Sequence, residues 1–141
     1  RQRPDLRQVS RAAQLIQAAK RPLMIIGGGV VYSNAADHIR EFAEKYHIPF
    51  TETQAGKGAL PSGHPLNLGA VGVTGTSCAN EISAKADLIL AVGTRLSDFT
   101  TASKSLFHRD ATSIVGINVN TFDAAKGAVE SIIGDADASI C

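Results

Sequence analysis

Short apolar runs recur along this chain, and each is bounded by residues that favour turns. The clearest is Leu88–Val92, which is apolar at every position and is followed by Gly93. A run that is hydrophobic throughout is typical of a strand buried on both faces of a parallel sheet. The same reasoning predicts further strands over residues 23–26, 49–53, 113–119 and 128–133.

Between these runs, apolar residues recur at the three- and four-residue spacing of amphipathic helices. The pattern predicts helices over residues 7–19, 35–46 and about 76–85. The expected boundary residues are Pro22, which stops the first helix, Ser33 or Asn34, which caps the second, and Thr76 or Ser77, which caps the third. Residues 54–68 contain three glycines and two prolines, so we expect a loop there.

Strands that alternate with helices indicate the α/β fold class. We expect a Rossmann-like open parallel sheet with helices on both faces and right-handed crossovers. The 141 residues fit a single domain. The first residue is not Met, and Gly134 to Ile140 is typical of a strand end followed by one helical turn. We therefore expect residues 1–141 to be a piece of a longer protein.

The composition excludes several classes of function. The net charge is +1, without the basic excess of a nucleic-acid-binding protein. No apolar run approaches the roughly 20 residues of a membrane span. Two cysteines, Cys78 and Cys141, are too few for a disulfide framework, and the four histidines, including His108, have no metal-ligand spacing. We expect a cytoplasmic protein with reduced thiols that binds no metal, nucleic acid or membrane.

Glycines mark two candidate binding turns. Gly27-Gly28-Gly29 follows the first strand, but the dinucleotide fingerprint requires a glycine where this chain has Tyr32. An incomplete nucleotide site and a turn that needs glycine dihedrals both remain open. Gly69, Gly72 and Gly75 precede the third helix, where backbone amides could bind a phosphate or the glycines could allow close packing.

A third candidate is Gly93-Thr94-Arg95, because ligands of open α/β sheets bind beyond the carboxyl ends of strands. Arg95 could pair with a phosphate or form a structural ion pair with Asp98 or Glu52. Glu52 has the spacing of a ribose-binding acid, although an exposed loop acid is the default explanation. Cys78 has no accompanying base, so we expect a buried thiol. Asp98, Arg109 and Asp110 show no catalytic spacing, and no catalytic residue is assigned.

Together these segments resemble the central domain of thiamine-diphosphate-dependent enzymes. The resemblance covers nearly the whole chain and lies in residues 18–30, 48–53, 56–61, 64–65, 72–80, 86–95 and 134–136. Residues 98–103 and 116–120 resemble the inositol-catabolism branch of that family. Its members are hydrolases that break a carbon–carbon bond of an inositol-derived ring.

The resemblance implies a scaffold that lies between two catalytic domains. In the family, thiamine diphosphate and Mg²⁺ bind a Gly-Asp-Gly motif that is missing from this sequence. We therefore expect the cofactors to belong to the parent enzyme, and residues 1–141 alone to catalyse nothing. The expected partners are the flanking domains of the same chain and further copies of the parent in a homo-oligomer.

Some relatives hold FAD or ADP in this domain. Thr74 stands where the FAD-binding members have His, and Asn118 stands where an acid is expected, so the resemblance implies a vestigial nucleotide site. The alternatives are an FAD- or ADP-binding module of an acetolactate-synthase-like enzyme and a stand-alone dehydrogenase, for which no acid–base pair is visible. Carried over by motif, the site comprises Gly28, Gly29, Gly72, Val73, Thr74, Gly93, Arg95 and Asp135.

Overall fold

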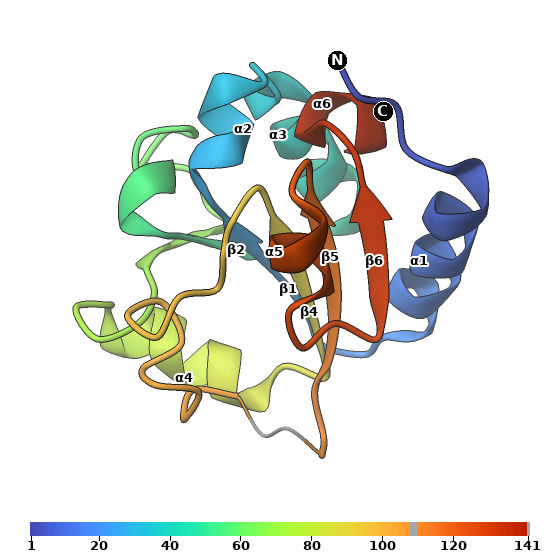
Figure 1. The fold of residues 1–141 in the computed structure, drawn as a ribbon. Helices are drawn as coiled ribbons and strands as arrows, with labels where there is room; N and C mark the ends of the chain where they lie inside the picture. The colour runs from blue at the N-terminus through green and yellow to red at the C-terminus, as the bar shows by residue number, and fades with distance from the viewer. Residues whose placement is uncertain (108–109, 141) are drawn as a thin grey trace.

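Six parallel strands form one sheet in the computed structural model, which describes residues 1–107 and 110–140 (Figure 1). Their order across the sheet is β3-β2-β1-β4-β5-β6, and every neighbouring pair runs parallel. The expected open parallel sheet is therefore confirmed. The strands are β1 (Pro22–Ile26), β2 (Phe50–Glu52), β3 (Asn67–Ala70), β4 (Leu88–Val92), β5 (Ser113–Asn118) and β6 (Glu130–Ile133).

Helices cover both faces of the sheet, as the sequence predicts (Figure 1). One face carries α1 (Leu6–Ala18), α2 (Gly28–Tyr32), α3 (Ala36–Tyr46) and α6 (Ala136–Ile140), and the other carries α4 (Ser77–Lys85) and α5 (Thr121–Ala125). The short 3-10 turn η1 (Gln54–Gly56) follows β2. His108, Arg109 and Cys141 lie outside the described residues.

Strand β4 is the centre of this arrangement. It pairs with β1 on one side and with β5 on the other, and all five of its residues are buried. Leu90 and Val92 belong to the core beneath α1 and α3, whereas Ile89 and Ala91 belong to the core beneath α4. A strand with both faces covered needs apolar residues at every position, which explains why its sequence pattern is so clear.

Strand β3 and helix α5 are among the elements that the sequence analysis missed. Strand β3 lies in a segment expected to be loop and glycine turn. It is an edge strand of four half-buried residues, so no continuous apolar run marks it. Helix α5 is too short to show a helical period, although Asn120 caps it by accepting hydrogen bonds from the amides of Phe122 and Asp123.

The expected caps are right in one case and wrong in another. Thr76 caps α4 by accepting a hydrogen bond from the amide of Ala79 at 3.1 Å. Neither Ser33 nor Asn34 caps α3, because Ala35 is at the N-cap position. Ser33 is buried, and its hydroxyl donates to the carbonyl of Val30. The extra turn α2, which the sequence analysis treated as a simple glycine turn, shifts the start of α3 past both polar residues.

No helix in the described part of the chain is long and apolar enough to cross a membrane.

Candidate functional site

A cleft of about 570 Å³ opens at the carboxyl edge of the sheet. It lies where the chain leaves β1 in one direction and β4 in the other, the topological switch point at which α/β proteins bind ligands. Residues that follow four different strands line it. They are Gly28, Gly29 and Tyr32 after β1, Thr53, Gln54 and Ala55 after β2, Val71 after β3, and Gly93, Thr94, Arg95, Ser97, Phe99 and Thr100 after β4, with Asn118 of β5 and Asp123 of α5.

The glycines after β1 are there because two backbones touch. The amide of Gly29 donates to the carbonyl of Gly93 at 2.9 Å. A Cβ on Gly27 would lie 2.3 Å from that carbonyl oxygen, and a Cβ on Gly29 would lie 2.6 Å from the Gly93 Cα. None of the three glycines has a positive φ, so the explanation from glycine dihedrals is wrong for this turn. Close packing against the chain that follows β4 requires Gly27 and Gly29 instead, whereas a Cβ on Gly28 would meet the Ala55 side chain at 3.2 Å.

The glycine repeat before α4 is also a packing feature. Gly72 has a φ of +105°, and a Cβ there would lie 2.3 Å from the carbonyl oxygen of Phe99. Asn80 holds Gly72 by accepting from its amide and donating to its carbonyl, at 3.0 and 2.9 Å. The amide of Val73 donates to Phe99. These amides are committed to the fold, which leaves fewer donors for a phosphate.

Arg95 is the one cation that lines the cleft within the described residues. Its side chain is exposed, and across the described residues no ion pair joins it to Asp98 or Glu52. The structural ion pair considered from the sequence is therefore not formed. A guanidinium at the mouth of a cleft can bind an anionic ligand group in a bidentate manner.

Glu52 differs from both interpretations offered by the sequence. It ends β2, only 5% of it is exposed, and it does not line the cleft. Its Oε1 atom and the hydroxyl of neighbouring Thr51 have no hydrogen-bond partner. The carboxylate is thus neither an exposed loop acid nor placed to meet a ribose in the cleft.

Asn118 lines the cleft, and its side-chain amide already makes two hydrogen bonds within the protein. Its Nδ2 donates to the carbonyl of Thr94 at 3.2 Å, and its Oδ1 accepts from the amide of Asn120 at 3.0 Å. The side chain therefore ties the end of β5 to the segment that follows β4. A carboxylate could accept the second hydrogen bond but could not donate the first, which gives a structural reason for Asn at this position.

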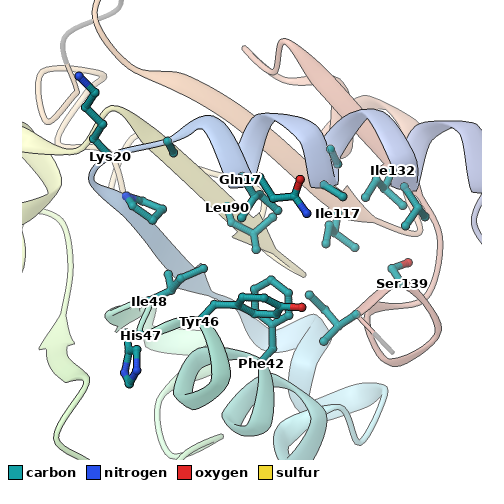
Figure 2. Close-up of a pocket in the computed structure, with 17 residues that line it drawn as sticks. Gln17, Lys20, Phe42, Tyr46, His47, Ile48, Leu90, Ile117, Ile132 and Ser139 are labelled. Carbon is teal, nitrogen blue, oxygen red and sulfur yellow. The ribbon is translucent and has the colours of Figure 1, made fainter.

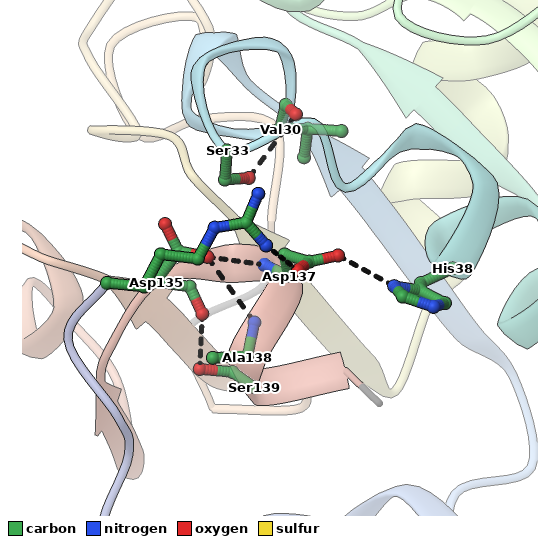
Figure 3. Close-up of polar contacts among 8 residues, drawn as sticks. Val30, Ser33, His38, Asp135, Asp137, Ala138 and Ser139 are labelled. Atoms are coloured by element: carbon green, nitrogen blue, oxygen red, sulfur yellow. Dashed lines mark hydrogen bonds and ion pairs between the residues drawn. The ribbon is translucent and has the colours of Figure 1, made fainter.

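Asp135 lies at the same carboxyl edge of the sheet as the cleft but does not line it. It follows β6, and its Oδ1 accepts hydrogen bonds from the amides of Asp137 and Ala138, so it caps α6 (Figure 3). Asp137 in turn pairs with Arg1 and with Nδ1 of His38. Among the predicted site residues, the cleft contains Gly28, Gly29, Gly93 and Arg95, the loop beside it contains Gly72, Val73 and Thr74, and Asp135 does not line it.

The cleft offers little acid–base chemistry. Asp123 is its one carboxylate among the described lining residues, and the described chain holds no group of three His, Cys, Asp or Glu side chains suited to a metal ion. Cys78 is exposed, so the expectation of a buried thiol is wrong. Such a site can bind or pack against another group, but it lacks a paired acid and base.

Sequence reasoning missed the cleft residues after β2 and in the segment 97–100. Thr53 ends the predicted strand 49–53, Gln54 and Ala55 lie in the stretch interpreted as a loop, and Phe99 belongs to a motif used only for the family resemblance. The signal that could have found them is position, because each follows the carboxyl end of a predicted strand.

The doubly wound sheet and its glycine-packed switch point define a class, and comparison with known proteins identifies it. Residues 9–140 match the family model described as "Thiamine pyrophosphate enzyme, central domain". The chain belongs to this family, as the motifs of the sequence indicate.

Individual relatives within the family resemble this chain more specifically. The chain is 53% identical over 140 residues to 3D-(3,5/4)-trihydroxycyclohexane-1,2-dione hydrolase of Geobacillus thermodenitrificans, covering 99% of this chain and 22% of that protein. It is 48% identical over 136 residues to a Bacillus cereus protein of the same description, covering 96% and 21%. The chain thus spans about a fifth of the length of these relatives. A Mycobacterium smegmatis protein assigned as a thiamin diphosphate-dependent enzyme has the same fold, with a TM-score of 0.83 and 24% identity; the match covers 99% of this chain and 27% of that protein.

Proposed function

We propose that this chain is the central scaffold of a thiamine-diphosphate-dependent hydrolase. The parent enzyme would break a carbon–carbon bond of trihydroxycyclohexane-1,2-dione in the breakdown of myo-inositol. One observation carries the proposal: 53% identity over 99% of the chain to a protein described as that hydrolase. Function resides in sites rather than folds, so the family alone would not identify the substrate.

The described residues do not fit thiamine diphosphate and Mg²⁺ themselves. Mg²⁺ beside a diphosphate is held by one or two carboxylates, but Asp123 is the one carboxylate among the described lining residues of the cleft, and the described chain holds no group of three His, Cys, Asp or Glu side chains. The cofactors of the parent would therefore bind elsewhere in the enzyme. The flanking domains of the same chain, further copies in a homo-oligomer and a cytoplasmic location are parts of the same proposal.

The test uses the full-length protein that contains this chain. We expect it to hydrolyse trihydroxycyclohexane-1,2-dione only when thiamine diphosphate and Mg²⁺ are supplied. The 141-residue chain should show neither this activity nor specific heat on calorimetric titration with thiamine diphosphate. A full-length protein that is inactive on this substrate, or a micromolar isotherm from the 141-residue chain, would contradict the proposal.

The second candidate is a nucleotide-binding module, favoured by the exposed Arg95 at the cleft. Ligand at a hundred times its Kd stabilises a protein by about 2.7 kcal/mol, so ADP or FAD in excess would visibly raise the melting temperature of the full-length protein. We expect no rise that depends on Arg95. If ADP raises the melting temperature, Arg95→Ala abolishes the effect and Lys57→Ala, an exposed cation outside the cleft, preserves it, the nucleotide module is correct.

A further inference from the structure

Hollows outside the cleft differ in what lines them. Leu90, Ile117 and Phe42 line a largely apolar hollow between α1 and α3 (Figure 2). Nothing in the structure shows what covers it, so we assign no ligand there. A further hollow, of about 390 Å³, lies on the sheet face that carries α4 and α5, and it combines apolar surface with charge.

We call this further hollow the lysine pocket. Leu96, Phe107 and Ile114 form its apolar floor, and the more exposed Lys104 and Lys126 lie at its rim. Pockets for small molecules have volumes of roughly 300–1,000 Å³ and are mostly apolar, with a few polar groups that orient the ligand. The lysine pocket therefore has both the size and the division of surface that a small ligand requires.

The lysine pocket exists because no helix covers this part of the sheet. Parallel strands are usually joined by a helix, but across its described residues the connection from β4 to β5 contains none (Figure 1). Leu96 and Phe107 of this connection pack into the core beside α4 instead. A Cβ on Gly127 would touch the Cδ1 atom of Ile114 at 3.9 Å, so the glycine leaves the approach to the floor open.

An unusual backbone conformation places Lys104 at the rim. Ala102, Ser103 and Lys104 have φ angles of +47°, +57° and +67°, and residues other than glycine rarely adopt this left-handed conformation in succession. The Thr101 hydroxyl holds the turn, since it accepts from the amide of Lys104 at 3.1 Å and donates to the carbonyl of Ser97 at 3.0 Å. Strained turns persist where the surrounding structure fixes them, and they are common at ligand sites.

The described residues do not neutralise the two ammonium groups of the lysine pocket. Neither Lys104 nor Lys126 makes an ion pair or a side-chain hydrogen bond with any of them. Lys126 is nevertheless half-buried, although a lysine without a partner usually extends its ammonium group into water. The rim of the pocket thus attracts an anionic group.

We propose that the lysine pocket binds a small organic carboxylate, with its apolar body on the floor and its anionic group at the two lysines. A polyol fits poorly, because the hydroxyls of Thr101 and Thr112 already donate to backbone carbonyls. A phosphate favours free backbone amides or an arginine, and the amide of Lys104 is already bound to Thr101. An inorganic anion of any kind would gain nothing from the apolar floor.

Benzoate tests the proposal, because it joins a carboxylate to an apolar ring. It is titrated into the full-length protein that contains this chain, and methyl NMR follows the Cδ1 group of Ile114, whose signal is assigned by its loss in Ile114→Val. We expect benzoate to shift this signal to saturation. Benzamide, which has the ring without the charge, and inorganic phosphate, which has charge without the ring, should each bind about tenfold more weakly.

Two substitutions test the lysines directly. Lys126→Met and Lys104→Met remove the charge and keep an unbranched side chain of similar length. Each should weaken benzoate binding by about three- to fivefold, the contribution of one partly exposed ion pair. Lys57→Met is the matched control and should leave the affinity unchanged, because Lys57 is exposed and does not line the pocket.

The proposal is overturned if benzoate leaves the Ile114 signal unshifted, or if the shift does not saturate. It is also overturned if benzamide binds as tightly as benzoate, since the charge then plays no part, or if phosphate does, since the floor then plays no part. Unchanged benzoate affinity in both lysine variants would likewise show that the rim does not recognise the carboxylate. Benzoate bound elsewhere in the enzyme is insensitive to these two substitutions.

Discussion

The amide of Gly29 donates to the carbonyl of Gly93 at 2.9 Å, and this contact joins the ends of β1 and β4 at the centre of the sheet. The two backbones approach so closely that a Cβ on Gly93 would lie 2.6 Å from the Gly29 Cα. A dinucleotide needs open backbone amides at this turn. Here one of those amides holds the sheet together, which supports a scaffold rather than a nucleotide site.

Three glycine-to-alanine substitutions separate the causes of glycine use. Gly93→Ala combines a φ of +59° with this clash, Gly58→Ala has a φ of +82° and open space, and Gly63→Ala has neither constraint. A left-handed residue costs about 1–2 kcal/mol and overpacking about 1–3 kcal/mol more. Urea unfolding should therefore rank Gly93→Ala as the most destabilised and Gly63→Ala as neutral or slightly stabilised. Equal losses for Gly93 and Gly58 would mean that the contact with Gly29 matters little.

Ile89 tests the position of β4. Its side chain is fully buried and packs in the core beneath α4, so Ile89→Ala should reduce the free energy of unfolding by about 2–5 kcal/mol. Thr76→Ala, which removes the cap of α4, should cost nearer 1 kcal/mol. Both are measured by urea unfolding. A loss at Ile89 no greater than that at Thr76 would argue against a central strand covered on both faces.

The sequence predicted best where burial is complete. Leu88–Val92 matches β4 at both ends because every position is buried between two layers. Asn67–Ala70 was missed because an edge strand of half-buried residues carries no such pattern. Ser33 was assigned as a cap because propensity cannot reveal the extra turn α2 that moves it into the core.

The sequence likewise predicted some features of the candidate site and missed others. Gly28, Gly29, Gly93 and Arg95 could be placed together because all follow strands that a parallel sheet brings to one edge. The sequence could not show that Asn118 already donates to Thr94, or that Glu52 is turned away into the interior. Both depend on contacts between segments far apart along the chain.

Asp87 makes stability depend on pH. Burial raises the pKa of its carboxyl, but the hydrogen bonds from the amides of Lys20 and Arg21 outweigh this effect, so its pKa lies below the ordinary value of 3.8. A lowered pKa in the folded state contributes stability that is complete above the unfolded-state pKa and is lost as the pH falls through the folded-state pKa. Unfolding free energies should therefore fall below about pH 4, and Asp87→Asn should flatten this fall.

At pH 7 the same substitution should cost about 1.5–3 kcal/mol, the usual contribution of hydrogen bonds to a charged group. Asp98→Asn is the control, because Asp98 is exposed and its carboxylate makes no hydrogen bond or ion pair with the residues that the structure describes. Urea unfolding between pH 3 and pH 7 compares both variants with the wild type. An Asp87→Asn protein with the wild-type pH profile would show that the carboxylate does not stabilise the link from α1 to β1.

Two asparagines near the cleft differ in whether the side-chain NH2 group donates a hydrogen bond, and this difference gives the sharpest test of the site. Asn118 donates through Nδ2 to the carbonyl of Thr94, whereas Asn120 only accepts, from the amides of Phe122 and Asp123. Asp can replace an acceptor but not a donor. Asn118→Asp should lose about 1–3 kcal/mol, because a carboxylate oxygen then faces the Thr94 carbonyl without a proton between them. Asn120→Asp should be neutral or stabilising, since a negative charge favours the start of α5. Thermal and urea unfolding of the two variants measure this difference in stability. If Asn118→Asp were harmless and also gave the protein affinity for ADP, the amide at this position would be excluding a nucleotide rather than bracing the sheet.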